Sequence, residues 1–335
     1  MAIIDFNEQV AREMGELVGG GVTSFKLYMA YKNTLQVDDG AIYRAFRRGR
    51  ETGALLGFHC ENGDIIEVLV EKALAAGQVS PRYHALTRPA AVETEAVNRV
   101  IALAEMTQAP VYIVHLSTAG GLAAVLAGKA RGVKVYAETC PQYLLLDESR
   151  YEAAGFEAAK YVMSPPLRTL QDQQALWDGL RAGMIDTLAT DHCSFNYRGQ
   201  KELGRDNFTL IPGGGPGVEH RLALLYTYGV LPGKITLQQM VAFTATNPAR
   251  LFGLFPRKGI IAPGSDADIV VWNPGFTATI TAARQVQRVD YTPYEGWSQQ
   301  GRAEIVLLQG RPVVTDGMIN DEPQGGYLRR KPFLK

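Results

Sequence analysis

Short apolar runs alternate with longer amphipathic stretches over the first three-quarters of the chain. The runs are rich in β-branched and aromatic residues and predict strands at 21–30, 54–59, 110–115, 133–138 and 184–191. Between them, apolar residues recur at spacings of three and four, which predicts helices at 40–53, 91–108, 121–132 and 171–183. Such repetition is typical of parallel strands with right-handed crossovers. Because the strands are apolar on both faces, the pattern favours a parallel barrel or a doubly wound sheet.

A different pattern begins near Gly253, after a helix predicted at 236–254. Residues 258–274 and 301–318 alternate between apolar and polar and predict two hairpins of a small β domain. The basic end of the chain predicts an extended arm. We therefore expect an α/β domain over 1–255, a small β domain over 256–320 and a C-terminal arm over 321–335.

Composition and charge narrow the class of protein. The chain has 335 residues, 34 Lys+Arg against 34 Asp+Glu, and 46% hydrophobic residues. This length allows one large α/β domain and a small second one. The balanced charge argues against a nucleic-acid or anionic-membrane partner, and no apolar run approaches the ~18 residues of a spanning helix. The start has no basic segment before an apolar one, and the cysteines form no CxxC pair, so we expect free thiols in the cytoplasm.

Four chemically capable residues fall at the carboxyl ends of predicted strands. Lys26 lies near the end of the first strand, and His59, His115 and Asp191 end three others. Taken singly, the lysine could extend to solvent, each imidazole could be a hydrogen-bonded core residue, and the aspartate could cap the next segment. Together they favour a shared site, because barrel enzymes aim side chains from this rim at one point.

Two imidazoles and a carboxylate suit zinc or another borderline divalent ion. Such a metal lowers the pKa of bound water towards ~7, and an aspartate beside it can accept the proton. Addition of carbon dioxide to Lys26 would give a carbamate able to bridge two metals, and would explain a buried amine. His84 and His192, in predicted loops, and His220, at a helix start, are weaker candidates.

Longer strings resemble one family over nearly the whole chain. The chain is similar to the cyclic amidohydrolases, most closely to the D-hydantoinase and dihydropyrimidinase branch. The resemblance implies a (β/α)8 TIM barrel with a small β-sandwich domain, and a two-metal site, usually zinc, bridged by a carboxylated lysine. It is carried by TSFKLYMAYKN (23–33), GFHCENGD (57–64), VYIVHLST (111–118), YVMSPPLR (161–168), LATDHCSF (188–195) and KGIIAPGSDADIVVWNP (258–274).

The resemblance also implies roles for single residues of the metal site. Lys26 matches the bridging lysine, and His59 and His115 match the two ligands of the second metal. Asp191 matches the aspartate that binds the first metal and transfers the proton. Tyr31 matches a tyrosine that donates to the developing oxyanion.

Further matches concern the substrate. Ser164 matches a residue that binds the ring amide through its main chain. Gly213 stands where relatives commonly carry Asn, at a contact made by the main-chain carbonyl. Tyr28 and Leu35 follow the lysine and suit a hydantoin with an apolar substituent at position 5.

One departure from the family concerns the start of the chain. Relatives carry a His-x-His pair on their first barrel strand, whereas the first histidine here is His59. By this comparison strand 21–30 is the fourth of eight, and 1–5 ends the third. The resemblance thus implies an incomplete barrel and only a portion of the β-sandwich. We expect this chain to hold at most one zinc well and to be weak or inactive alone.

The leading hypothesis is a hydrolase that opens a hydantoin or 5,6-dihydropyrimidine ring to an N-carbamoyl amino acid. Alternatives are an allantoinase- or dihydroorotase-type hydrolase, or an inactive scaffold such as the collapsin response mediator proteins. A fragment or late-start product of a full enzyme is favoured over the scaffold. Relatives are tetramers that use their C-terminal arms, so we expect a homo-oligomer, a tetramer or a dimer.

Overall fold

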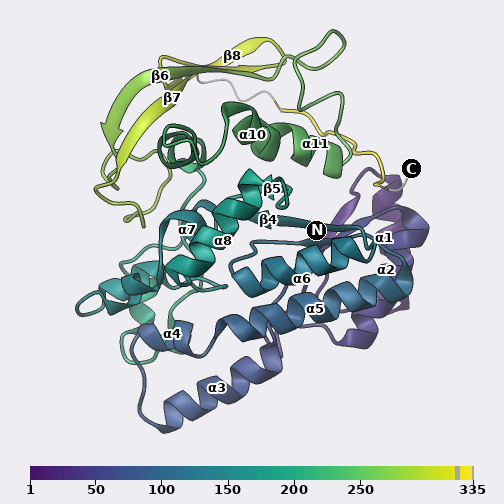
Figure 1. Ribbon diagram of the computed structural model, residues 1–335, viewed down its shortest axis with the longest axis vertical. Helices are drawn as coiled ribbons and strands as arrows, with labels where there is room; N and C mark the ends of the chain where they lie inside the picture. Colours follow the sequence, from purple (N-terminus) through teal and green to yellow (C-terminus); the bar gives the residue numbers. More distant parts are fainter. Residues whose placement is uncertain (321–324, 334–335) are drawn as a thin grey trace.

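The computed structural model describes residues 1–320 and 325–333, which form two sheets and the helices around them (Figure 1). Five parallel strands lie side by side in chain order, as the alternation of strands and helices predicted. They are β1 (Ser24–Tyr28), β2 (Leu55–His59), β3 (Val111–Ile113), β4 (Val135–Thr139) and β5 (Thr187–Leu188). The α/β class with a parallel sheet is thereby confirmed.

The helices between these strands cover one face of the sheet. Four of them begin and end within two residues of their predicted bounds: α2 (Asp39–Thr52), α5 (Ala90–Thr107), α6 (Ala119–Ala130) and α8 (Leu170–Arg181). Four further helices were not predicted from the sequence: α1 (Glu8–Gly19), α3 (Gly63–Ala75), α4 (Arg82–Leu86) and α7 (Pro141–Leu145). Among the described residues, no helix combines the length and the apolar character that crossing a membrane requires.

Capping residues explain where these helices begin and end. The carboxylate of Asp38 accepts a hydrogen bond from the main-chain N–H of Ala41 at 2.6 Å, which starts α2. That helix ends at Gly53, whose φ of +79° is the left-handed conformation that favours glycine. Thr169 and Asp172 form a reciprocal capping box at the start of α8.

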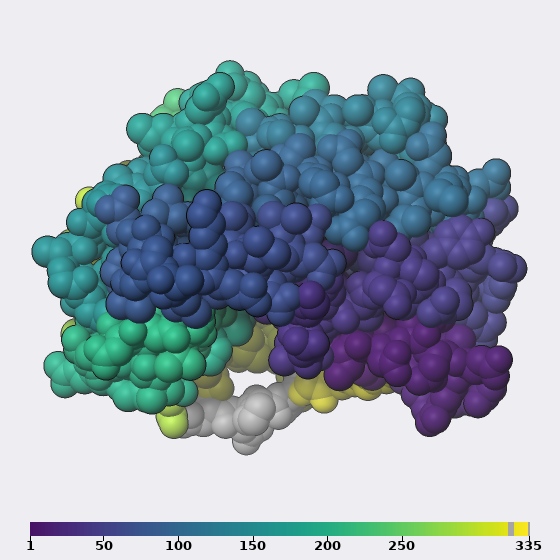
Figure 2. Space-filling model, turned by 90° about the horizontal axis from the view of Figure 1, so that it is seen from below, coloured from purple at the N-terminus to yellow at the C-terminus, as the bar shows by residue number. Residues whose placement is uncertain are grey.

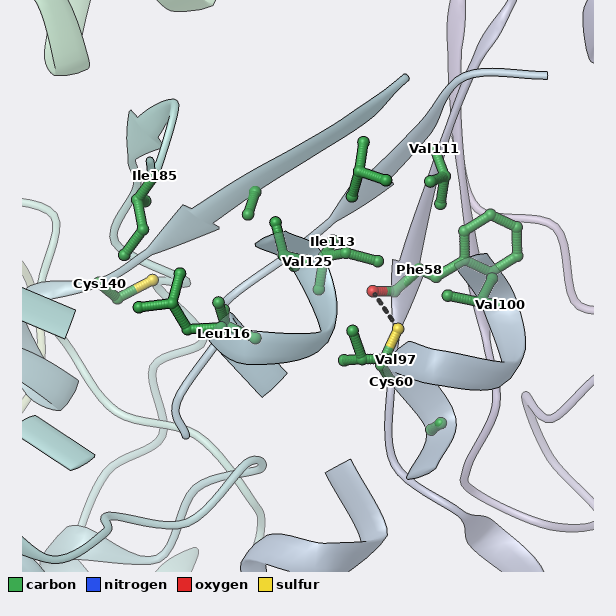
Figure 3. Packing of buried hydrophobic residues seen from close by; sticks show 14 of the residues in the cluster. Phe58, Cys60, Val97, Val100, Val111, Ile113, Leu116, Val125, Cys140 and Ile185 are labelled. Carbon is green, nitrogen blue, oxygen red and sulfur yellow. Dashed lines mark hydrogen bonds between the residues drawn. The ribbon is translucent and has the colours of Figure 1, made fainter. Parts of the chain in front are cut away.

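The alternation of side chains along β1 separates core from site. Phe25 and Leu27 are buried in the main apolar cluster, whereas Ser24, Lys26 and Tyr28 point to the opposite face and are half-buried. The same cluster joins Phe58, Val111 and Ile113 of the strands to Val97 and Val100 of α5 and Val125 of α6 (Figure 3). Packing of the helices therefore directs Lys26 away from the apolar layer.

The second sheet is antiparallel and lies beyond α10 (Leu237–Val241) and α11 (Asn247–Leu251) at one end of the molecule (Figure 1). Its strands are β6 (Ile269–Thr279), β7 (Ser298–Leu308), β8 (Arg311–Thr315) and β9 (Met318–Ile319). The hairpin predicted at 301–318 is present as β7 and β8.

The hairpin predicted at 258–274 is wrong. Residues 258–268 form turns, and β6 is one long strand that pairs with β7 instead. Asp266 accepts from Arg257 at 2.8 Å and lies 2.9 Å from the ammonium of Lys258. These ion pairs hold the segment in a closed turn, so its apolar residues do not form a strand.

The predicted helix 236–254 is a helix with a widened turn in its middle. A π turn over 242–246 separates α10 from α11. It ends two residues before Pro248, which has no N–H to donate to the helical ladder. The wider turn lets the helix pass this proline without breaking.

Single bridges extend the parallel sheet on both sides. Lys26 donates its main-chain N–H to Met1 at 2.8 Å, and Ile3 donates to Lys26 at 2.8 Å, so the first residues run parallel to β1. Beyond β5, His192 forms a parallel bridge with Gly215.

The described part of the C-terminal arm, residues 325–333, packs against the amino-terminal part of the same chain (Figure 2). Arg330 donates to Gly21 at 3.1 Å, Lys331 to Gly253 at 2.9 Å and Phe333 to Gly53 at 2.7 Å. The ring of Phe333 packs edge-on against Tyr136, 5.4 Å between centroids. The arm therefore covers the amino-terminal ends of β1 and β2. Residues 321–324 and 334–335 of the predicted arm lie outside the described residues.

Gly253 provides a test of this docking. Its φ is +72°, and a Cβ there would overlap the main chain of Lys331, whereas Gly233, at +75°, has open space around it. Gly233→Ala should cost only the conformational strain, about 1 kcal/mol. Gly253→Ala should cost more in the free energy of unfolding and should speed tryptic cleavage after Arg329 and Arg330. Equal stability and equal cleavage rates in the two variants would show that the arm is not held at this point.

Candidate active site

Two imidazoles face each other at the carboxyl ends of neighbouring strands. His59 is the last residue of β2, and His115 follows β3. Nδ1 of His59 lies 2.9 Å from Nε2 of His115, and the two side chains are only 1% and 2% exposed. Nδ1 of His115 has no hydrogen-bond partner among the described residues. Two nitrogens therefore converge on one buried point.

Glu61 fixes the orientation of the His59 ring. Its Oε2 lies 2.9 Å from Nε2 of His59, so Nε2 carries the proton and Nδ1 presents its lone pair to His115. Burial raises the pKa of Glu61, but the hydrogen bond from His59 and the nearby positive charges, those of Arg88 and Arg168 included, outweigh it, and the pKa is lowered overall. Glu61 is therefore ionised, and the sequence analysis missed it. The His-x-Glu spacing was the available signal, because residues two apart on an extended segment share a face.

Lys26 reaches the same region from β1. Its Nζ lies 5.0 Å from the centroid of the Tyr28 ring. Burial, followed by the charge of Lys26, lowers the pKa of His115 well below its usual value. In the register of the sheet Lys26 lies beside Gly57, and a Cβ at that glycine would come within 3.3 Å of Val114. Glycine is therefore the residue that fits beside the lysine without crowding Val114.

Glu138 of β4 is a second carboxylate that the sequence analysis missed. It accepts from the hydroxyl of Tyr112 at 2.6 Å and from the main-chain N–H of His115 at 3.3 Å. Burial raises the pKa of Glu138, and the negative charge of Asp191 adds to this effect. Asp191 is itself half-buried and has a φ of +47°. The carboxylate of Asp191, which follows β5, is therefore close enough to affect the charge of Glu138.

Tyr31 lies against the first imidazole, 4.9 Å between ring centroids. Burial, then the charge of Glu61, raises its pKa, so the hydroxyl keeps its proton at neutral pH and can donate it in a hydrogen bond. Tyr31, His115 and Asp191 all have positive φ. Such conformations cost of order 1–3 kcal/mol each in non-glycine residues and are typical of functional sites.

The two predicted substrate contacts are brought together. A Cβ built on Gly213 would lie 3.5 Å from Oγ of Ser164. Oγ of Ser164 lies 3.3 Å from Nε2 of His84. The prediction that His84 lies in a loop is wrong, since it is buried in α4 and also bonds the carbonyl of Met163 at 2.9 Å. His84 supports the segment that carries Ser164.

The remaining candidates lie outside this cluster. His192 is exposed, and its Nδ1 accepts from Gly217 at 3.2 Å. His220 is buried at the start of the short helix α9 (Arg221–Leu225), where the sequence placed it. The cysteines are free thiols as predicted; Cys60 and Cys140 are buried and Cys193 is exposed.

The described residues provide part of a metal-binding site. Within residues 1–320 and 325–333, no three His, Cys, Asp or Glu side chains are arranged to hold a metal by themselves. The facing nitrogens of His59 and His115 would supply two ligands to such an ion. A third has to come from another kind of group, and a carboxylated Lys26 would be one.

A model described as the amidohydrolase family matches residues 3–320. The chain belongs to the amidohydrolase family. It is 44% identical over 335 residues to a D-hydantoinase of Geobacillus stearothermophilus, covering 99% of this chain and 71% of that one. A D-hydantoinase of Streptomyces coelicolor is 47% identical over 316 residues, 94% of this chain and 68% of the relative. A solved dihydropyrimidinase from Brevibacillus agri superposes with a TM-score of 0.98 at 45% identity, covering 100% of this chain and 73% of that one.

These comparisons confirm the resemblance found in the sequence. The family match spans both sheets, and the similarity to solved structures extends through the whole strand order. They also show that the chain spans about seven-tenths of the length of these relatives.

His84 generates a prediction about pH. Burial, then the charge of Arg88, lowers its pKa well below the usual 6.5. As pH falls through about 6.5 the unfolded chain binds a proton there and the folded protein does not, so stability falls by up to about 1.4 kcal/mol per pH unit. Urea unfolding at several pH values should show a shallower acid-side decline for His84→Gln than for the wild type. His192→Gln, at an exposed position, should keep the wild-type slope, and a wild-type slope in His84→Gln would contradict the assignment.

Proposed function

We propose that this chain is a metal-dependent hydrolase that opens a cyclic amide. The substrate is a hydantoin or a 5,6-dihydropyrimidine, and the product is the corresponding N-carbamoyl amino acid or 3-ureido acid. The observation that carries the proposal is the buried pair of facing imidazoles, His59 and His115, backed by Glu61 and adjoining Tyr31. The similarity to D-hydantoinases and a dihydropyrimidinase supports the substrate class.

Zinc suits this donor set, because imidazole nitrogen and carboxylate-like oxygen are its usual ligands together with thiolate. The residues that would hold it are His59 through Nδ1, His115 through Nε2, and Lys26 carboxylated on its amine. When bound, the metal lowers the pKa of a water molecule and supplies hydroxide at neutral pH.

The protein's own residues perform the remaining chemistry. Asp191 takes the proton of the attacking water and gives it to the ring nitrogen as the carbon–nitrogen bond breaks. The hydroxyl of Tyr31 donates to the carbonyl oxygen while negative charge develops there. The carbonyl carbon gains the hydroxyl group and becomes the carboxylate of the product after that group loses its proton to solvent, while the ring nitrogen becomes the terminal NH2 of the product. The main chain at Ser164 and Gly213 orients the ring amide.

Side chains around Tyr31 suit an apolar ring substituent. The ring of Tyr28 lies 6.0 Å from the rings of both Tyr31 and His59. Leu35 is half-buried in the segment that follows. A 5-substituted hydantoin with an aromatic or aliphatic side chain is therefore the favoured substrate.

The number of metals follows from the ligands that this chain supplies. Strands β1 to β5 correspond to the later strands of an eight-stranded barrel, and β6 to β9 to a portion of the β-sandwich. A first metal would have only Asp191 and the carbamate of Lys26 as ligands. A second metal would have that carbamate together with His59 and His115. The chain alone is therefore proposed to hold one zinc well, with weak activity, and to assemble as a homo-oligomer.

Metal analysis of the purified chain tests the ligand set. We expect about one zinc per chain, with loss of both zinc and ring opening in His115→Ala, because one of the two convergent nitrogens is removed. His192→Ala removes an exposed imidazole and should keep the metal. Two tightly held zinc ions with full activity would contradict the single-metal proposal, and zinc retained by His115→Ala would contradict the ligand assignment.

Removal of one hydroxyl tests the oxyanion donor. Tyr31→Phe should lower kcat by about 10²- to 10³-fold, the usual cost of one such donor, while the zinc content stays unchanged. Tyr327→Phe is the control, because Tyr327 is 68% exposed and donates only to the carbonyl of Gly20. A Tyr31→Phe enzyme with wild-type kcat would remove this residue from the mechanism.

A further inference from the structure

Lys201 is a fully buried lysine that forms no ion pair in the described part of the chain. Its exposed fraction is 0%, and its Nζ donates to three main-chain carbonyls, those of Val162 at 2.8 Å, Pro212 at 2.9 Å and Gly214 at 2.7 Å. A buried ammonium is costly unless its donors are satisfied. Here the number of acceptors matches the three hydrogens that an ammonium carries. Each hydrogen of the Lys201 ammonium therefore has its own acceptor.

The three carbonyls flank the residues that the proposed function assigns to the ring amide. Val162 lies two residues before Ser164, and Pro212 and Gly214 are the neighbours of Gly213. The two segments also touch directly, since Gly214 donates its main-chain N–H to Val162 at 3.0 Å. Lys201 therefore links residues 162–164 to residues 212–214, the two main-chain segments that the proposed function assigns to the substrate.

The surroundings of the lysine are apolar and rigid. It begins the short 3-10 turn η3 (Lys201–Gly204), and a Cβ on Gly204 would overlap Ile211. Val162, Phe208 and Ile211 belong to one buried apolar cluster beside it. Because these walls offer no other acceptors, the ammonium depends on the three carbonyls.

The charge of Lys201 acts on one titratable neighbour. After burial and the charge of Arg88, it contributes to lowering the pKa of His84. Burial lowers the pKa of Lys201 to about 7. The carbonyl oxygens act in the opposite direction, because a neutral amine has only two hydrogens to donate to three acceptors.

We propose that Lys201 is the positioning residue that holds the main chain of residues 162–164 and 212–214 in the arrangement that binds the cyclic amide. This inference rests on the proposed function, which assigns Ser164 and Gly213 to the substrate. Lys201 touches no reacting atom, so it acts on substrate affinity. A guanidinium cannot replace it, because three acceptors around a single nitrogen suit the compact ammonium and not a planar fork.

The test uses the full chain loaded with zinc, in the forms wild type, Lys201→Met, Lys201→Arg and Lys160→Met. Lys160 is the control lysine, because its ammonium is partly exposed and makes an ion pair with the exposed carboxylate of Glu157. We measure kcat and KM with hydantoin, the affinity of the zinc-loaded chain for hydantoin by calorimetry, and hydrogen exchange of main-chain amides.

For Lys201→Met and Lys201→Arg we expect KM to rise by about tenfold or more, with kcat changed much less, because displaced main chain weakens binding. Amide exchange should accelerate at 162–164 and 213–215 and stay unchanged in α5 and α6. Lys160→Met should match the wild type in every measurement. If Lys201→Met fails to fold, Lys201→Arg, which keeps the charge and a similar length, carries the test.

Other outcomes overturn the proposal. Unchanged KM and unchanged exchange at the two segments would show that the contacts of Lys201 do not position them. A general acceleration of exchange through α5 and α6, with kcat and KM altered together, would show a purely structural role. Failure of the proposed function is distinguishable, because the wild type would then neither bind nor open hydantoin while the exchange measurement still decides whether Lys201 holds the two segments.

Discussion

Parallel pairing of β1, β2 and β3 is the constraint on which the site depends. Tyr28 lies beside His59 in the register, and β3 ends so that His115 follows at the same rim. Parallel strands end at one edge, and their side chains alternate between two faces. Because the apolar positions of each strand pack against the helices, the polar positions must share the other face. The imidazoles of His59 and His115 approach to 2.9 Å because both lie on this face of the sheet, and no sequence motif near either residue would have placed them there.

A buried network of charges keeps this rim in order. Arg168 lies 3.9 Å from carboxylate oxygens of both Glu61 and Glu93, and its Nε donates to Ser117 at 3.1 Å. Glu93 in turn accepts from the main chain and the hydroxyl of Ser117. Buried carboxylates are tolerated when charges and hydrogen bonds compensate them. The guanidinium thus helps Glu61 to remain ionised, and ionised Glu61 orients His59.

The sequence was informative where chemistry followed the period of a strand or helix. Lys26, His59, His115 and Asp191 could be found because each lies at the end of an apolar run, and their roles came from the resemblance to the family. Glu138 was missed and His84 was ranked low, because their partners lie on other elements. Lys201 could not be recognised from the sequence, because its hydrogen-bond partners are main-chain carbonyls, which every residue type carries. The strand at 258–274 was misplaced because ion pairs, invisible to an alternation of polar and apolar residues, close that segment into a turn.

The docking of the arm has a consequence for the order in which the protein is made. Phe333 donates its main-chain N–H to Gly53 and packs on Tyr136, so a segment that is synthesised late covers strands that are synthesised much earlier. Until residues 325–333 have left the ribosome, Tyr136 and the start of β2 lack this cover. Domains fold from the amino terminus during synthesis, and exposed apolar surface is then open to wrong partners. The nascent chain therefore passes through a period in which a chaperone, or another copy of itself, competes with its own tail for the same aromatic surface.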